Sequence, residues 1–262
     1  MTTDAHPVNP GTPSHATRRF DAVICDIDGC LSPEHSGPMD VPSLAKIAAH
    51  NHLAQDRHDR PVVTLCSGRP QPFAEAMCRL IGNRTLPIVC ENGVWMYDPI
   101  TNEYLMDPAI TERHLEMVAE ASRWVRTDLG PRGVTIQPGK AASISLYHRE
   151  TDVLRGLLPE IERVFAREGW GLRVSMTWLY INCDLTHVSK ATGIARLIQR
   201  TGLTRERLAG IGDTTSDLAI REHVAWFGCP ANAQDQIKGH ADFIASKPEA
   251  EGALEILCRV SV

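Results

Sequence analysis

Apolar runs of strand length alternate with helical patterns along most of this chain. β-prone apolar runs that stop at polar or small residues predict strands at 20–25, 61–66, 86–90, 208–212 and 224–227. Apolar positions with helical spacing, bounded by proline or glycine, predict helices at about 41–55, 70–81, 189–202 and 248–258. Because strands that alternate with helices are typical of a parallel sheet, these segments predict an α/β fold.

The middle of the chain has a different pattern. The runs 143–146 and 174–178 place apolar residues on one face only, which predicts an antiparallel sheet whose other face meets solvent or a ligand. The alternation changes phase between Trp178 and Leu179, where we expect a bulge or a turn.

Two helices are predicted in the same region. The first spans about 110–125, where apolar residues are spaced by three and four. The second spans about 151–168, and Pro159 either delays its start or kinks it. We therefore predict a parallel-sheet core, at 19–97 and 184–262, with an α+β cap inserted at 98–183. Residues 1–18 lack an apolar segment and predict a flexible tail.

Composition narrows the class of protein. Net charge is -5 and no long basic run is present, so we expect no nucleic-acid partner. No apolar run reaches the ~20 residues of a membrane helix, so we expect no membrane association. The eight cysteines show neither a CxxC pair nor zinc-site spacing, which predicts reduced thiols in a cytoplasmic protein. Nothing in the composition indicates an oligomeric state.

Reactive side chains follow several of the predicted strands and helices. They are Asp26 and Asp28, Ser67, Lys190, and Asp213 with Asp217. Each alone has a purely structural explanation: an acidic loop, a turn hydrogen bond, a solvated helix start or a favourable helix dipole. Parallel strands share one carboxyl edge, however, so these groups can converge there. Together they predict an oxygen-rich Mg²⁺ site with donors for a phosphoryl group.

Four motifs carry a family resemblance. They are Asp-Ile-Asp-Gly-Cys-Leu at 26–31, Ser-Gly-Arg at 67–69, Val-Ser-Lys-Ala-Thr-Gly at 188–193 and Gly-Asp-Thr-Thr-Ser-Asp at 212–217. With these motifs the chain resembles the haloacid dehalogenase superfamily of aspartyl-phosphate hydrolases, from about residue 19 to the end. The inserted module resembles the type IIB cap of the Cof-like sugar-phosphate phosphatases. The resemblance implies a Rossmann-like core.

The resemblance also implies roles for the motif residues. Asp26 would attack phosphorus, and Asp28 would protonate the leaving group and then activate water. The phosphoryl oxygens would be held by Ser67, Gly68 and Lys190. The ligands of Mg²⁺ would be Asp26, the backbone carbonyl of Asp28, Asp213 and, from farther out or through water, Asp217. The implied reaction is hydrolysis of a small phosphorylated metabolite, such as a sugar phosphate or a related phosphoester.

Two positions depart from the family pattern. Ser216 stands where relatives often carry Asn, and Cys30 stands where Thr is usual. We expect the first to tune the site and the second to pack in the core. Further candidates for contact with substrate are Arg69, Asn92, Lys140, Trp178 and Ser216, with His148, Tyr180 and Asn232 as other possible neighbours of the site. Two alternatives remain: a phosphomutase or phosphotransferase on the same scaffold, and a non-catalytic receiver-like module.

Overall fold

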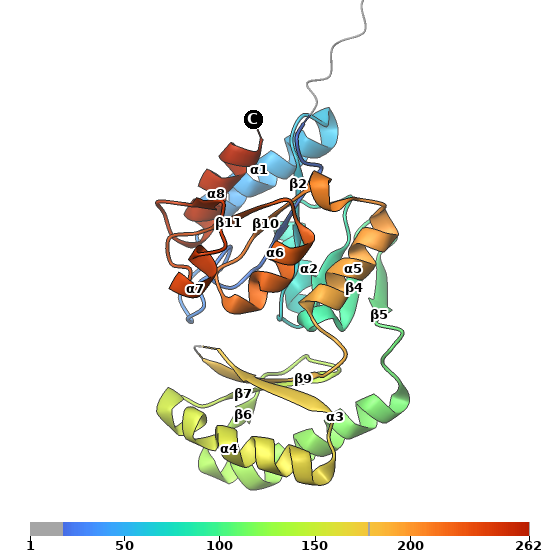
Figure 1. Cartoon of the computed structure of the whole chain (residues 1–262), viewed down its shortest axis with the longest axis vertical. Helices are drawn as coiled ribbons and strands as arrows, with labels where there is room; N and C mark the ends of the chain where they lie inside the picture. The colour runs from blue at the N-terminus through green and yellow to red at the C-terminus, as the bar shows by residue number, and fades with distance from the viewer. Residues whose placement is uncertain (1–17, 178, 262) are drawn as a thin grey trace, which may run out of the picture.

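The computed structural model describes residues 18–177 and 179–261 and shows two lobes (Figure 1). The larger lobe contains both described ends of the chain. The smaller lobe is a sheet whose one face looks toward the larger lobe and whose other face carries two helices. Two chain segments join the lobes, one after β5 and one between β9 and α5. The predicted tail at 1–18 lies outside the described residues except for Arg18.

A five-stranded parallel sheet forms the centre of the larger lobe. Its order is β12-β11-β10-β1-β2, and every recorded pairing within it is parallel. The strands are β1 (Ala22–Cys25), β2 (Val62–Leu65), β10 (Leu208–Ile211), β11 (Trp226–Cys229) and β12 (Phe243–Ile244). The first four confirm predicted strands, whereas the two-residue β12 was not predicted.

Helices cover both faces of this sheet. Val23 and Cys25 of β1 pack with α1, α2 and α8, and Ala22 and Ile24 pack with α5 and α6 on the opposite face. The helices are α1 (Val41–Arg57), α2 (Gln71–Leu80), α5 (Lys190–Thr201), α6 (Leu218–His223), α7 (Asp235–Lys238) and α8 (Glu249–Val260). A strand buried on both faces needs apolar residues at every position, which is why β1 reads as a continuous apolar run.

The run 86–90 forms a strand but not a regular member of the parallel sheet. β3 (Ile88–Cys90) pairs antiparallel with β4 (Trp95–Asp98), which pairs with β5 (Glu103–Met106). One parallel bridge, Cys66 to Val89, connects β3 to the end of β2. The β4–β5 hairpin was not predicted, and the predicted domain boundary at residue 98 falls inside it.

The smaller lobe follows the predicted α+β pattern. Its antiparallel sheet has the order β6-β7-β9-β8. The elements are α3 (Glu112–Trp124), a π-helical turn (Val125–Leu129), β6 (Thr135–Ile136), β7 (Ser143–Tyr147), α4 (Thr151–Glu168), β8 (Leu172–Met176) and β9 (Tyr180–Leu185). Between β8 and β9, the Thr177 amide donates a hydrogen bond to the Tyr180 carbonyl. The phase change predicted between Trp178 and Leu179 falls on Trp178, which lies outside the described residues.

Pro159 does not delay the start of α4. The helix begins at Thr151 and continues through the proline, which lies on its exposed side. The buried side chains of α4, among them Leu157, Ile161 and Phe165, pack against Ile144 and Ile181 of the sheet. This apolar layer outweighs the backbone hydrogen bond that a proline removes.

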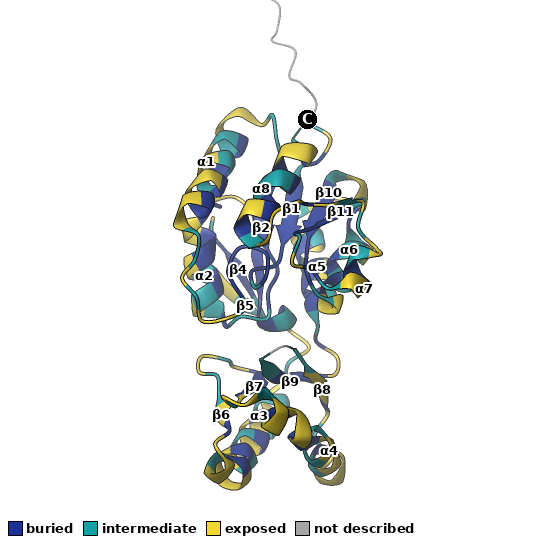
Figure 2. Cartoon of the chain, turned by 90° about the vertical axis from the view of Figure 1, so that its left-hand side faces the viewer, coloured by how far each residue is buried: buried dark blue, intermediate teal, exposed yellow. Residues whose placement is uncertain are grey.

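Apolar and polar side chains alternate along the cap strands as predicted, and Figure 2 shows α3 and α4 on the side of this sheet away from the larger lobe. The polar positions of β7 are buried as well, since Ser143 and Ser145 are 4% and 1% exposed. Ile144, Leu146, Ile181 and Cys183 face α3 and α4 and are buried in the core of the lobe. The alternate positions point toward the larger lobe, and the register aligns them in two polar rows. One row is Ser143, Asp184 and Arg173, and the other is Ser145, Asn182 and Ser175. The cap therefore offers a polar sheet face to the core.

In the described part of the chain, no helix combines the length and apolar character that crossing a membrane requires. All eight cysteines fall within the described residues and are free thiols; seven are buried and Cys258 is exposed.

Candidate active site

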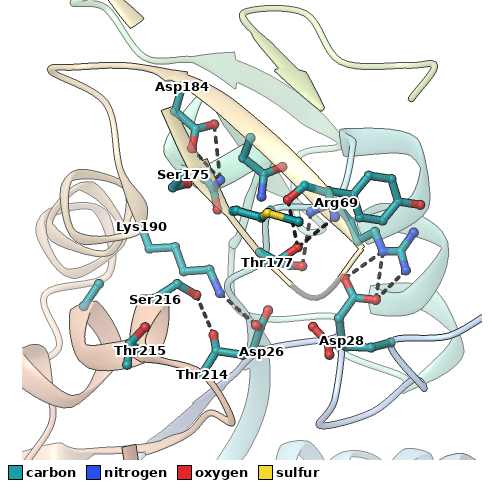
Figure 3. A pocket seen from close by; sticks show the side chains of 18 of the residues that line it. Asp26, Asp28, Arg69, Ser175, Thr177, Asp184, Lys190, Thr214, Thr215 and Ser216 are labelled. Atoms are coloured by element: carbon teal, nitrogen blue, oxygen red, sulfur yellow. Dashed lines mark hydrogen bonds and ion pairs between the residues drawn. The ribbon is translucent and has the colours of Figure 1, made fainter. Parts of the chain in front are cut away.

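The carboxyl edge of the parallel sheet and the polar face of the cap enclose one cavity (Figure 3). Its volume is about 440 Å³. The core residues around it include Asp26, Asp28, Ser67, Lys190 and Asp213. The structure thus brings together residues that are up to 187 positions apart in the sequence, from Asp26 to Asp213. This is where ligands bind in open α/β sheets.

Lys190 connects two carboxylates from different segments. Its ammonium group donates to Asp26 Oδ2 at 2.8 Å and to Asp217 Oδ1 at 2.7 Å. Lys190 is the first residue of α5, where Ser189 and Thr192 form a reciprocal capping box that fixes the helix start. Burial opposes its positive charge, but the two carboxylates more than offset this and raise the pKa of Lys190.

Asp217 has a supporting position beneath the site. Its carboxylate is fully buried, and Oδ2 accepts from the backbone amides of Asp213 and Thr214 at 3.0 and 3.1 Å. Because Oδ1 accepts from Lys190, both oxygens have partners. Asp217 therefore holds the Asp213 loop and the lysine together.

Asp213 packs directly against Gly29. Gly29 has φ +70°, and a Cβ at this position would lie 2.0 Å from Asp213 Oδ2. Both the left-handed backbone and the close approach require glycine. The Asn232 side chain donates to the Gly29 carbonyl at 2.9 Å and holds this loop, so Asn232 is a neighbour of the site and not a cavity-lining residue.

Three buried carboxylates can share one cation. Ligand oxygens of Asp26, Asp213 and Asp217 lie within 4.8 Å of one another. Burial and the neighbouring charges raise the pKa of Asp26 to about 7 and that of Asp213 to about 9. With one ammonium among three carboxylates, the ionised site carries an excess of two negative charges. A hard divalent cation with oxygen ligands fits this set of donors.

Asp28 lies beside the carboxylate cluster and not within it. Arg69 Nε donates to its two carboxylate oxygens at 2.9 and 2.7 Å, and Arg69 Nη2 donates to Oδ1 at 2.5 Å. Burial opposes the charge of Arg69, but the ion pair outweighs this and raises its pKa. The guanidinium also lies 4.9 Å from the centre of the Phe73 ring. Arg69 thus fixes the orientation of Asp28.

The Ser67 loop is packed against the turn that leads toward the cap. Ser67 is fully buried, and its hydroxyl accepts from the Arg69 amide at 3.2 Å. Asn92, at φ 52°, donates its side-chain amide to Asp184 of the cap at 3.1 Å. A Cβ on Gly68 would lie 2.9 Å from Asn92 Oδ1. Asn92 is therefore a link between core and cap.

The remaining sequence candidates have different outcomes. Lys140, Tyr180 and Ser216 line the cavity. Trp178 lies outside the described residues. His148 does not line this cavity; its Nδ1 lies 3.0 Å from the Glu150 carbonyl oxygen at another edge of the cap.

Several cavity residues were missed from the sequence. Glu34 lines the core side, where burial and the nearby Asp28 charge raise its pKa to about 7. Arg173, Asn182 and Asp184 line the cap side. The alternation that predicted the cap sheet also continues through 180–184, so extending it would have placed Asn182 and Asp184 on the polar face. No comparable local signal singles out Glu34.

The structure combines a parallel α/β core, a buried Asp, Lys and Ser set at its carboxyl edge and an inserted cap, and such a set of groups suits phosphoryl transfer. Comparison with known proteins makes the class of protein specific. A family model described as haloacid dehalogenase-like hydrolase matches residues 169–257. A phosphoglycolate phosphatase of Methanothrix thermoacetophila is 33% identical over 238 residues, covering 91% of this chain and 96% of the relative.

The chain belongs to the haloacid dehalogenase-like hydrolases and is a phosphoric monoester hydrolase. A phosphoglycolate phosphatase of Methanopyrus kandleri is 23% identical over 237 residues, with 90% of this chain and 94% of the relative covered. This assignment sets aside the non-catalytic receiver-like alternative.

Solved structures agree on the fold. A Thermoplasma acidophilum protein superposes with a TM-score of 0.69 at 19% identity, covering 92% of this chain and 98% of that one. The sucrose-phosphatase of a Synechocystis species superposes with a TM-score of 0.62 at 15% identity, covering 93% and 98%. At these identities the likeness concerns the fold alone.

Proposed function

We propose that this protein is a Mg²⁺-dependent phosphatase that hydrolyses a small phosphorylated metabolite through a phosphorylated Asp26. The observation that carries the proposal is the buried Lys190 ammonium held between Asp26 and Asp217, at 2.8 and 2.7 Å. A buried cation beside a carboxylate at a sheet edge serves two needs of phosphoryl transfer. It orients the nucleophile, and it offsets negative charge on the transferred group.

Asp26 is the nucleophile in this proposal. Its Oδ1 accepts from the Ile27 amide at 2.8 Å and its Oδ2 accepts from Lys190, so the carboxylate has a fixed direction at the cavity wall. Attack on phosphorus forms an acyl phosphate and expels the substrate alkoxide; water then attacks the acyl phosphate and restores the carboxylate. Ser67 and the backbone beside Gly68 are placed to bind the phosphoryl oxygens.

Asp28 is the general acid and base. Two residues after Asp26, it reaches the same cavity from the adjoining loop. In the resting protein its carboxyl group is paired with Arg69. A substrate anion that draws Arg69 away would leave Asp28 available for proton transfer. Arg69 therefore has the position of a residue that controls Asp28.

The carboxylates that fit Mg²⁺ are Asp26 and Asp213, with Asp217 positioning both through Lys190 and the Asp213 amide. When bound, the cation supplies charge neutralisation for the approach of an anionic phosphate to an anionic carboxylate. The chain itself supplies the orientation of both groups.

A small organic phosphate matches the size of the cavity. About 440 Å³ is at the lower end of the range for ligand sites. The curated relatives described above are phosphoglycolate phosphatases, and a structural neighbour is a sucrose-phosphatase. These support a compact phosphoester, either a sugar phosphate or a phosphorylated hydroxy acid.

Metal removal and product analysis test this proposal. We expect the protein to release inorganic phosphate from p-nitrophenyl phosphate with Mg²⁺, to stop when EDTA is added, and to recover when excess Mg²⁺ is restored. Full activity in EDTA would contradict the proposed metal dependence. Transfer of the phosphoryl group to an added sugar, without free phosphate, would favour the phosphotransferase alternative.

A further inference from the structure

The polar face of the cap contains a charged group that the proposed chemistry does not use. Lys140 lies in the loop before β7 and lines the cavity from the cap side. Its ammonium donates to Ser145 Oγ at 2.5 Å. The Ser145 hydroxyl donates in turn to Asn182 Oδ1, also at 2.5 Å. We refer to Lys140, Ser145 and Asn182 as the Lys140 relay.

In the Lys140 relay, the Lys140 ammonium and the Asn182 amide can still donate hydrogen bonds toward the cavity. Since Asn182 Oδ1 accepts from Ser145, the Asn182 amide group is left as a donor, and Lys140 has three N–H donors of which Ser145 takes one. Among the described residues no other partner of the Lys140 ammonium is recorded. Asn182 also lines the cavity, so its amide and the ammonium can bind one ligand.

The nearby carboxylates are engaged elsewhere. Glu91 accepts from the Ala141 and Ala142 amides and from Ser143 Oγ, each at 2.9 Å through Oε1. Asp184 accepts from Asn92 at 3.1 Å and lies 3.9 Å from Arg173. Burial lowers the pKa of Lys140, and the charges of Asp184 and Glu91 offset this only in part. A desolvated ammonium with a neutral hydroxyl as its partner is stabilised by an anion.

Glu91 of the core fixes the position of the loop that carries Lys140. Glu91 belongs to the core turn after β3. Its carboxylate accepts hydrogen bonds from the backbone amides of the two residues that follow Lys140. Lys140 belongs to the cap, and the hydrogen bonds to Glu91 also connect its loop to the core. A loop fixed at both sides can present a charge in a defined position.

We propose that the Lys140 relay is a subsite for a carboxylate on the substrate's carbon skeleton, at the end away from the phosphate. The proposal rests on the phosphatase function above and narrows its substrate class to phosphorylated hydroxy acids. The ammonium supplies the charge, and the Asn182 amide can donate to the second carboxylate oxygen. A neutral sugar end leaves the ammonium without an anion in direct contact, which disfavours binding.

Two matched substrate pairs test the subsite. 2-Phosphoglycolate and ethyl phosphate differ by a carboxylate, as do 3-phosphoglycerate and glycerol 3-phosphate at one carbon longer. In at least one pair we expect the wild-type protein to prefer the acid in kcat/KM by about 30-fold or more. In Lys140→Met this preference falls to within about threefold of unity, and in Lys140→Arg part of it returns. Lys46→Met, an exposed lysine of α1, is the matched control and keeps the preference.

The outcomes separate the two proposals. If the wild-type protein hydrolyses p-nitrophenyl phosphate but prefers neither acid, or if the preference survives in Lys140→Met, the subsite proposal is wrong while the phosphatase proposal stands. If no phosphoester is hydrolysed in Mg²⁺, the proposed function fails and the subsite falls with it. Thermal unfolding of each variant shows whether a loss reflects misfolding.

Discussion

At the scale of single residues, two acids only two positions apart have different surroundings. The Asp26 side chain is 9% exposed and bound by an ammonium, whereas the Asp28 side chain is 27% exposed and bound by a guanidinium. Asp26 directly follows β1, whereas Asp28 lies two residues farther along, next to Gly29, whose φ of +70° turns the chain. Different surroundings fit the proposed division of roles, with Asp26 as nucleophile and Asp28 as acid and base.

The role of Asp28 gives a prediction about leaving groups. An alkyl phosphate needs its departing oxygen protonated, whereas p-nitrophenolate leaves without help. We expect Asp28→Asn to lower kcat/KM for an alkyl phosphate by about 100-fold or more, and for p-nitrophenyl phosphate by less than about tenfold. The measurement is a pair of steady-state rates for each protein. Equal losses on both substrates would remove this role for Asp28.

Asp152→Asn provides the control for this comparison. Asp152 is 93% exposed on α4 of the cap, outside the cavity. Its substitution removes a carboxylate of the same kind and should leave both rates as in the wild type.

At the scale of elements, the turn after β3 is the part that couples core to cap. Glu91 and Asn92 both have left-handed backbones, with φ of 50° and 52°. Such conformations are uncommon outside glycine and persist where other contacts hold them. Here those contacts are hydrogen bonds that residues 141–143 donate to the Glu91 carboxylate and that the Asn92 side chain donates to Asp184. The turn therefore has an uncommon backbone conformation, and hydrogen bonds to the cap hold it in place.

Removal of the Glu91 carboxylate tests this coupling. Glu91→Ala leaves the Ala141 and Ala142 amides and the Ser143 hydroxyl without their acceptor, and we expect a loss of about 3 kcal/mol in the free energy of unfolding. Glu91→Gln keeps one acceptor oxygen and should lose less. Urea unfolding measures both. Glu116→Ala, at an exposed position of α3, is the control, and a Glu91→Ala loss no larger than that of Glu116→Ala would argue against the coupling.

At the scale of the whole molecule, local signals in the sequence predicted the parallel core, the inserted cap and the motif residues at the sheet edge. Strand ends, helix starts and turn residues are set by neighbouring positions, so Asp26, Ser67, Lys190 and Asp213 were found without a structure. Their meeting in one cavity followed from the shared edge of a parallel sheet.

What the sequence did not predict depends on contacts between distant segments. The Arg69 ion pair with Asp28 spans 41 positions, and Glu34 reaches the cavity from an irregular loop. Only the second strand of the β4–β5 hairpin, β5, was assigned to the predicted cap, and this strand is short and not buried. The Lys140 relay exists because Ser145 and Asn182 are register partners, which no local pattern fixes.

The most direct test of the whole account is the rate of phosphate release by Asp26→Asn. An amide cannot form the acyl phosphate, although it nearly preserves the shape of the side chain. With Mg²⁺ and p-nitrophenyl phosphate, we expect kcat to fall by a factor of about 10⁴ or more while the protein stays folded. A folded Asp26→Asn protein that retained a tenth or more of the wild-type rate would contradict the account.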